Sequence, residues 1–193
     1  MIAVIILAAG ESSRLGRAKQ RLEYKGKTLL NHAIDTAIEA AVGPVIVVMG
    51  ARENEIVSEI DTKKILVAHN ARWQEGTASS IHAGLTAAMQ KYPELDSVIL
   101  MVCDQPYVDP SLLKNLADTR NTSNKSIVAS SYNDTVGVPA LFDKRFFPEL
   151  LSLKGDEGGK KVLFHHDADI STVPFPEGSI DIDTESDYQS LSK

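Results

Sequence analysis

Apolar residues recur along this chain at two different spacings, and each spacing predicts a different kind of element. Short continuous apolar runs, rich in β-branched residues, predict buried strands at residues 2–7, 45–49, 65–68, 98–102, 127–129 and 140–142. Apolar residues three and four apart predict helices at residues 28–41, 53–60, 77–91, 146–153 and 160–165, and one more that Asp109 caps and Pro110 begins. Strands alternating with helices predict a mostly parallel sheet covered on both faces.

The stretch after the first strand is suited to holding phosphates. In such sheets, ligands bind outside the carboxyl ends of the strands. Gly10 stands where the chain must turn, which lets backbone N–H groups approach a ligand closely. Arg14, Arg17 and Lys19 then add positive charge. The stretch therefore predicts a phosphate-binding loop.

Two well-known phosphate motifs do not account for this loop. A Walker A motif that ends at Gly26-Lys27-Thr28 would need a glycine at position 21, which is Arg21. A dinucleotide-binding fingerprint needs three closely spaced glycines, and Gly10 and Gly16 lie too far apart. The loop carries its charges on side chains instead.

Composition narrows the class of protein. The 193 residues, 43% of them hydrophobic, are enough for one domain over 1–193 with a proper core. The net charge of −6 argues against a nucleic-acid partner, whereas the local positive charge at 14–27 indicates a small anionic ligand. A single cysteine excludes a disulfide framework. No apolar run has the form of a secretory signal or approaches the roughly 20 residues of a membrane span, so we expect a cytoplasmic location and no membrane partner.

The first loop resembles that of a known family. The motif Leu7-Ala8-Ala9-Gly10-x-Ser12-Ser13-Arg14-Leu15-Gly16-x-x-Lys19 is similar to the signature loop of the MobA-like nucleotidyltransferases, and within them to the molybdenum cofactor cytidylyltransferases. The resemblance implies a three-layer α/β/α Rossmann-like fold. It also implies that Lys19 and Arg14 neutralise phosphate charge during catalysis, and that the loop binds the nucleotide through Leu7, Ala8, Ala9, Gly10, Ser12, Ser13, Arg14, Gly16 and Lys19.

Two acidic segments resemble the metal-binding segments of the same family. Cys103-Asp104-Gln105-Pro106 ends a predicted strand, and the resemblance implies that Asp104 is a catalytic magnesium ligand. Near the end of the chain, Asp183 matches a second metal-facing aspartate, although Ser186 stands where the family has proline. Asp181 is an alternative ligand, and Asp183 could instead cap a helix. The implied cofactor is Mg²⁺, with Mn²⁺ as an alternative.

A third segment resembles the family pattern Asn-x-x-Trp-x-x-Gly-x-x-x-Ser. The likeness implies nucleotide-binding roles for Asn70, Gly76 and either Ser79 or Ser80. Trp73, the only tryptophan, fits core packing slightly better than stacking on a base.

Two further segments are implied to bind the acceptor. Residues 137–142 resemble a Gly-His-Pro-x-Leu-Phe pattern, with Val138 where many relatives have histidine, and residues 155–158 resemble a Gly-Asp-x-Gly turn. The implied acceptor-binding residues are Gly137, Pro139, Gly155 and Asp156. A plain turn at the start of a helix is an equally good interpretation of the second segment.

The resemblance implies transfer of a nucleotidyl group from a nucleoside triphosphate to a phosphorylated small molecule, with release of pyrophosphate. Because Ala9 leaves less room than the glycine typical of guanosine-using relatives, we expect CTP rather than GTP, with molybdopterin as acceptor. Alternatives are guanylyl transfer from GTP, a sugar or alcohol phosphate as acceptor, and a non-catalytic nucleotide-binding module that assists a molybdoenzyme. We expect a monomer or weak oligomer, and leave a molybdoenzyme partner open.

Overall fold

The chain, in a computed structural model that describes residues 1–191, is built on a seven-stranded sheet of order β5-β4-β1-β6-β8-β7-β9. Of these strands β8 alone runs antiparallel to its neighbours β6 and β7, so the prediction of a mostly parallel sheet is confirmed. The strands are β1 (Ile2–Leu7), β4 (Val45–Met49), β5 (Leu66–His69), β6 (Ser97–Val102), β7 (Ile127–Tyr132), β8 (Thr135–Asp143) and β9 (Ile170–Pro174).

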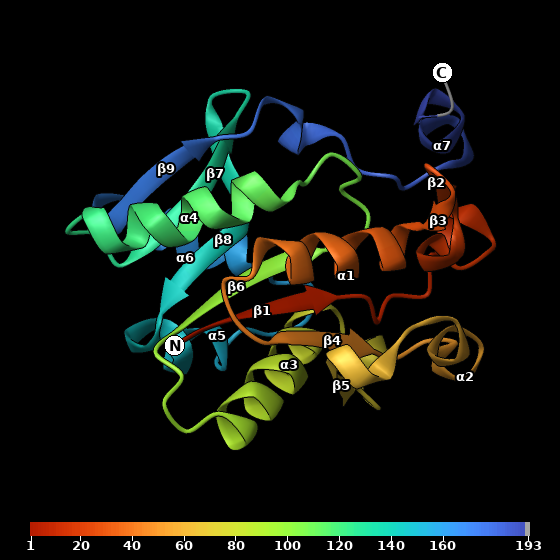
Figure 1. The fold of residues 1–193 in the computed structure, drawn as a ribbon, viewed down its shortest axis with the longest axis horizontal. Coiled ribbons are helices and arrows are strands. Elements are labelled where there is room, and N and C mark those ends of the chain that lie inside the picture. Colours follow the sequence, from red (N-terminus) through yellow and green to blue (C-terminus); the bar gives the residue numbers. More distant parts are fainter. Residues whose placement is uncertain (192–193) are drawn as a thin grey trace.

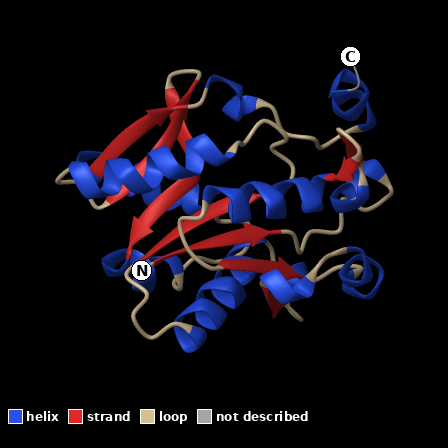
Figure 2. Cartoon of the chain, viewed as in Figure 1, coloured by secondary structure: helices blue, strands red, loops and turns tan. Residues whose placement is uncertain are grey.

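Helices cover both faces of this sheet, which gives the expected three layers (Figures 1 and 2). One face carries α1 (Leu29–Ala40) and α4 (Pro110–Thr122); the other carries α3 (Thr77–Lys91), α5 (Phe147–Leu150) and α6 (Gly159–His165). The side chains of β1 explain why both faces need cover. Val4 and Ile6 are fully buried in the core on the α1 side, and Ala3 and Ile5 are fully buried in the core on the α3 side.

Local sequence sets where the helices begin. The Thr28 hydroxyl accepts a hydrogen bond from the Asn31 N–H at 3.2 Å and caps α1. The Asp109 carboxylate accepts one from the Leu112 N–H at 2.7 Å and caps α4, whose first residue is Pro110, as predicted. None of the described helices combines the length and the apolar character needed to cross a bilayer.

The region after α4 differs from the predicted strand–helix alternation. Strands β7 and β8 form a hairpin whose turn residues, Asn133 and Asp134, have φ of 45° and 57°. Both strands extend beyond their apolar centres, and β9, which has few apolar residues, was not predicted. Gly137 and Pro139, which the resemblance implies bind the acceptor, lie inside β8 and not after the end of a strand. Because β8 is antiparallel, its beginning still lies at the carboxyl edge of the parallel strands.

The last described segment packs over the first loop at this edge. A small hairpin, β2 (Glu23–Tyr24) and β3 (Lys27–Thr28), lies there beside α7 (Glu185–Leu191), on the right in Figure 1, while α2 (Glu53–Ile56) follows β4. Ile182 is 0% exposed in a third apolar cluster with Leu22 and Leu29, and its N–H donates to the Asp104 carbonyl at 3.0 Å. The end of the chain is thereby held against the end of β6.

Candidate functional site

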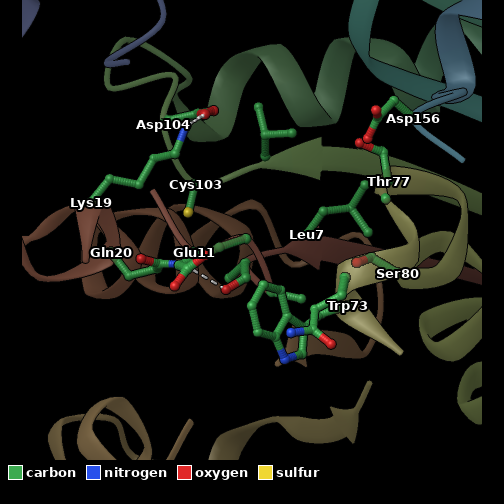
Figure 3. A pocket seen from close by; sticks show the side chains of 16 residues that line it. Leu7, Glu11, Lys19, Gln20, Trp73, Thr77, Ser80, Cys103, Asp104 and Asp156 are labelled. Atoms are coloured by element: carbon green, nitrogen blue, oxygen red, sulfur yellow. Dashed lines mark hydrogen bonds and ion pairs between the residues drawn. The ribbon is translucent and has the colours of Figure 1, made fainter. Parts of the chain in front are cut away.

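A cavity of about 340 Å³ opens where β1 and β6 end (Figure 3). Of the residues implied to form a site, the structure brings nine together in its lining: Leu7, Ala8, Ala9, Gly10, Lys19, Gly76, Ser80, Asp104 and Asp156. Seven others line it that the sequence motifs did not assign to the site: Glu11, Gln20, Trp73, Gln74, Thr77, Val102 and Cys103.

The first loop is shaped by residues that lie outside the lining. Ser12 and Gly16 both adopt left-handed conformations, with φ of 60° and 65°, on either side of a short helical turn. The Ser12 hydroxyl accepts a hydrogen bond from the Lys19 N–H at 3.1 Å. These contacts fold residues 12–19 back on themselves and aim Lys19 into the cavity. Ser13 also lies outside the lining, and the Ser12 hydroxyl is the one that shapes the loop within the described residues.

Gln20 closes the loop and was missed by the motif. Its side chain is only 2% exposed, and its Nε2 donates to the carbonyls of Ala8 at 2.8 Å and Gly10 at 2.9 Å. A buried amide that ties two backbone carbonyls together fixes where the backbone turns. The signal in the sequence was weak, because a glutamine after a lysine reads as an ordinary surface residue.

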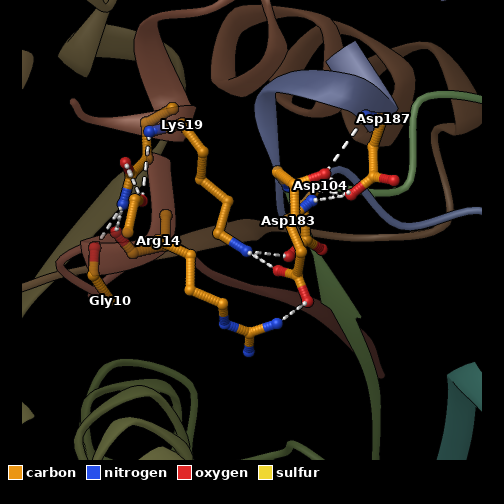
Figure 4. A network of polar contacts seen from close by, with 10 residues as sticks. Gly10, Arg14, Lys19, Asp104, Asp183 and Asp187 are labelled. Carbon is orange, nitrogen blue, oxygen red and sulfur yellow. Dashed lines mark hydrogen bonds and ion pairs between the residues drawn. The ribbon is translucent and has the colours of Figure 1, made fainter. Parts of the chain in front are cut away.

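Lys19 stands between two carboxylates that are far apart in sequence (Figure 4). Its Nζ lies 2.5 Å from the Asp104 Oδ2 and 2.8 Å from the Asp183 Oδ1, and Arg14 donates to the Asp183 Oδ2 at 3.1 Å. Burial alone would lower the pKa of Lys19, but the charge of Asp104 and hydrogen bonds to both carboxylates raise it above its usual value. The hydrogen bond from Lys19 lowers the pKa of Asp183 despite partial burial. Lys19 and Asp183 are therefore both charged at neutral pH.

A divalent cation fits this pair of acids. Both carboxylates already reach one cationic nitrogen, and they offer the oxygen atoms that Mg²⁺ and Mn²⁺ prefer. Residues 1–191 contain no group of three or more His, Cys, Asp or Glu side chains that could hold a metal. Mg²⁺ in proteins is commonly bound by one or two carboxylates, and water and phosphate oxygens fill its other coordination positions.

The helix cap that Asp183 could have formed is made by its neighbours. The Thr184 hydroxyl accepts from the Asp187 N–H at 3.2 Å, while the Asp187 carboxylate accepts from the N–H of Thr184 at 2.8 Å and of Asp183 at 3.2 Å. The Asp183 carboxylate is thus free to face Lys19. Asp181 differs, because burial and then the charge of Asp104 raise its pKa to about 6.

Asn70, which the resemblance implies binds the nucleotide, makes its side-chain hydrogen bonds within the protein. It is 3% exposed and absent from the cavity lining, and its Nδ2 donates to the hydroxyls of Ser79 at 2.9 Å and Ser80 at 3.1 Å. Its Oδ1 accepts from the Arg72 N–H at 3.0 Å. The amide therefore ties the turn at Arg72 to the first turn of α3. Ser79 also lies outside the lining, whereas Ser80 lines the cavity.

Trp73 and Gly76 form one wall of the cavity. A Cβ on Gly50 would lie 2.7 Å from the Trp73 Cβ, so the tryptophan packs against the end of β4 while its ring lines the cavity. Gly76 has φ of +97°, and a Cβ there would lie 2.4 Å from the Gly155 carbonyl oxygen. Only glycine suits this position, because both the backbone conformation and the close approach exclude a side chain.

Of the four residues implied to bind the acceptor, only one lines the cavity. Asp156 lines the cavity, and the Gly155 carbonyl accepts from the Ala78 N–H at 3.0 Å. Gly137 and Pro139 are buried in β8 and absent from the lining. Tyr132 packs closely on Gly137, since a Cβ there would lie 2.1 Å from the tyrosine hydroxyl oxygen. Cys103 lies in the lining as a protonated thiol, since burial raises its pKa to about 12.

Residues 4–170 match the family described as the MobA-like NTP transferase domain. The chain belongs to this family. The resemblance to the MobA-like nucleotidyltransferases is thereby confirmed, together with the α/β fold and the class of nucleotidyltransferase. The MobA-like match includes the cavity wall from Leu7 to Asp156 and ends before Asp183, so the second acid lies outside the matched residues.

Several proteins are similar to this MobA-like chain over most of its length. Nicotine blue oxidoreductase of Paenarthrobacter nicotinovorans is 27% identical over 165 residues, which cover 82% of this chain and 79% of that protein. The purine catabolism protein PucB of Bacillus subtilis is 26% identical over 167 residues, covering 82% and 78%. These names refer to different reactions, so the likeness shows the family and leaves the nucleotide and the acceptor open.

Solved structures show the same MobA-like fold. Rv0371c of Mycobacterium tuberculosis H37Rv matches with a TM-score of 0.83 at 28% identity, over 98% of this chain and 96% of that one. A structure of the same protein in complex with manganese matches with a TM-score of 0.82 at 27% identity, over 98% and 97%.

Proposed function

We propose that this protein transfers CMP from CTP to the phosphate of molybdopterin, and that it releases pyrophosphate in doing so. The observation that carries the proposal is the network of Lys19, Asp104 and Asp183 at the mouth of a cavity walled by the family's signature loop. The network supports a site for a metal-bound triphosphate, because it pairs fixed positive charge with two carboxylates that suit a divalent cation. The manganese complex of Rv0371c supports the use of such a cation here.

The proposed chemistry depends mainly on where charge is placed. An oxygen of the acceptor phosphate attacks the α-phosphorus, and the bond from that phosphorus to the pyrophosphate oxygen breaks. Both reactants are anionic, so Lys19 and Arg14 offset their repulsion and hold the triphosphate in line. A bound Mg²⁺, held by Asp104 and Asp183, would draw charge from the leaving group. No residue needs to remove a proton, because the acceptor phosphate is already ionised at neutral pH.

The preference for CTP rests on the size of the base site. Ala9 is 2% exposed, lines the cavity, and packs against Gly50, where an added Cβ would lie 2.9 Å from its own. Its methyl group occupies space that a glycine would leave to a purine. Competition between CTP and GTP for the protein with Mg²⁺ tests this preference, and tighter binding of GTP would contradict it.

The acceptor could also belong to a second class, the sugar or alcohol phosphates. Val138 replaces the histidine that many relatives carry, and it lies partly buried in β8. A nucleotidyltransferase for a sugar or alcohol phosphate is therefore the alternative, and parallel incubations with each acceptor separate the two. A single domain over 1–193, a cytoplasmic location, a monomeric or weakly associated state and a molybdoenzyme partner stay predictions.

The deciding experiment is pyrophosphate release by the Asp104→Asn variant with CTP, Mg²⁺ and molybdopterin. We expect a loss of at least about 100-fold in kcat, because one carboxylate of the pair loses its charge. Asp35→Asn is the matched control, since Asp35 also pairs with a lysine, Lys27, but on the surface. Unchanged turnover in Asp104→Asn would remove the metal assignment, and no turnover by the wild type with any acceptor would remove the proposed function.

A further inference from the structure

The carboxylate of Asp156 lies in the cavity without a partner from the protein. In Figure 3 it stands with Thr77 on the side of the cavity opposite Lys19. Within residues 1–191 it accepts no hydrogen bond and joins no ion pair, although three lysines are near it in sequence. The Lys161 ammonium pairs with Glu157 at 2.5 Å and that of Lys160 lies over the Phe164 ring, while the backbone N–H of Lys154 donates to Glu157 at 2.9 Å.

Backbone contacts position the turn that carries Asp156, whose side chain is exposed. Gly155, in a left-handed conformation with φ of +56°, turns the chain toward α3, and its carbonyl accepts from the Ala78 N–H at 3.0 Å. A Cβ on Gly76 would lie 2.6 Å from the Asp156 Oδ1, so that oxygen rests against the Gly76 backbone. Two turns with positive φ, at Gly76 and Gly155, meet to set the position of Asp156.

The charge of Asp156 restricts what can lie beside it. A free carboxylate repels phosphate, so a nucleotide or acceptor must direct its phosphates toward Lys19 and another part toward Asp156. The two oxygens of a carboxylate accept two hydrogen bonds side by side. The matching donor is a ring N–H next to an exocyclic amino group, which is the 2-amino-4-oxopyrimidine edge of pterin and of guanine. Cytosine instead places a ring nitrogen acceptor beside its amino group.

We propose that Asp156 is a specificity-determining residue that reads a 2-amino-4-oxopyrimidine edge, by accepting one hydrogen bond from the ring N–H and one from the amino group. This inference rests on the proposed transferase function, and it names the part of the substrate that binds on the side of the cavity opposite Lys19. The pterin of the acceptor and the guanine of GTP both carry the edge, and the test separates them.

The test compares ligand pairs that differ only in the amino group. Fluorescence titration with 6-hydroxymethylpterin and 6-hydroxymethyllumazine, which has oxygen in place of the amino group, probes the acceptor arm. Calorimetry with GTP and ITP, which lacks the amino group, probes the base arm. We expect the wild type to prefer the amino-bearing member of one pair by about 10- to 100-fold.

Asp156→Asn should reverse or abolish that preference, because an amide presents one donor and one acceptor, which suits lumazine. Glu157→Gln is the matched control, since its carboxylate faces Lys161 in the same turn, and it should leave the preference unchanged. If the substitution changes the ratio of the affinities for the pterin and the lumazine, the edge belongs to the acceptor. If it changes the ratio of the affinities for GTP and ITP, the edge belongs to the base of the nucleotide.

Equal affinities within both pairs in the wild type, or ratios that Asp156→Asn leaves unchanged, would overturn the inference. Binding of CTP with Mn²⁺, measured on the same samples, keeps this separate from the proposed function. Normal CTP binding with no pterin or guanine discrimination removes only the role of Asp156, whereas no binding of any nucleotide removes the transferase itself.

Discussion

Replacing Lys19 by methionine should tighten the binding of Mn²⁺ to the protein in the absence of nucleotide. In the wild type the lysine ammonium already lies between the carboxylates of Asp104 and Asp183, at 2.5 and 2.8 Å. A divalent cation must displace it from at least one of them. The same lysine is proposed to bind phosphate, so the nucleotide draws it away when substrate binds and leaves the acids to the metal.

The size of the effect follows from the hydrogen bonds that Lys19 makes to the two acids. A hydrogen bond between charged groups contributes about 1.5–3 kcal/mol, so a metal that no longer competes with one such bond should bind about 10- to 100-fold more tightly. The two oxygens lie at most about 5 Å apart, because both touch one nitrogen, and at an effective dielectric constant near 20 their charges repel by about 3 kcal/mol. The metal-free variant should therefore be less stable than the wild type and should recover on addition of Mn²⁺.

Isothermal titration with Mn²⁺ and thermal unfolding with and without the ion measure both effects. Lys27→Met is the matched control, because Lys27 forms a 2.5 Å pair with Asp35 on the surface, and its Mn²⁺ affinity should equal that of the wild type. CTP should bind Lys19→Met more weakly than the wild type. The reasoning is refuted if Lys19→Met binds Mn²⁺ no more tightly than the wild type, since the two acids would then not form the metal site.

Four other substitutions test the structure around the site. Gly76→Ala should lower the stability by about 2–4 kcal/mol in a denaturant titration, because an added methyl meets Gly155, whereas Gly16→Ala, with open space around it, should cost only about 1 kcal/mol. Ile182→Ala should lower the free energy of unfolding by about 2–4 kcal/mol and weaken nucleotide binding, since it anchors the last segment. Asp181→Asn should leave the free energy of unfolding unchanged below pH 4 and raise it by about 1 kcal/mol at pH 7. The pKa of the Asp181 carboxyl is raised to about 6 in the folded protein, so ionising it between pH 4 and pH 6 costs stability that the asparagine does not lose. Solvent screening reduces the size of this cost.

Most of the fold could be predicted from the sequence because its strands are buried on both faces. A strand such as β4 (Val45–Met49) is buried at every position, so it appears as an uninterrupted apolar run. β9 contains Ser171 and Thr172 and lies at the edge of the sheet, where fewer apolar contacts are needed. The hairpin of β7 and β8 was hidden for a related reason, since its outer halves are polar and partly exposed.

The candidate site was predictable where a residue's role is local, and less so where it depends on tertiary packing. The loop from Leu7 to Lys19 forms one continuous wall, and its motif is enough to place it. The residues next to Asn70 in sequence do not indicate that its amide will hydrogen-bond to the hydroxyls of Ser79 and Ser80. Gly137 and Pro139 likewise look accessible in a motif, yet β8 carries them into the sheet.

The position of Asp183 has a consequence for how the protein is made. It lies 164 residues after Lys19, and Ile182 beside it must dock under the first loop before the two acids can meet. A ribosome therefore completes the phosphate loop and most of the sheet long before it translates the second carboxylate. A nascent chain whose residue 183 is still in the exit tunnel would expose Lys19 with only one of its two acidic partners, so the full charge network assembles only after Asp183 has emerged.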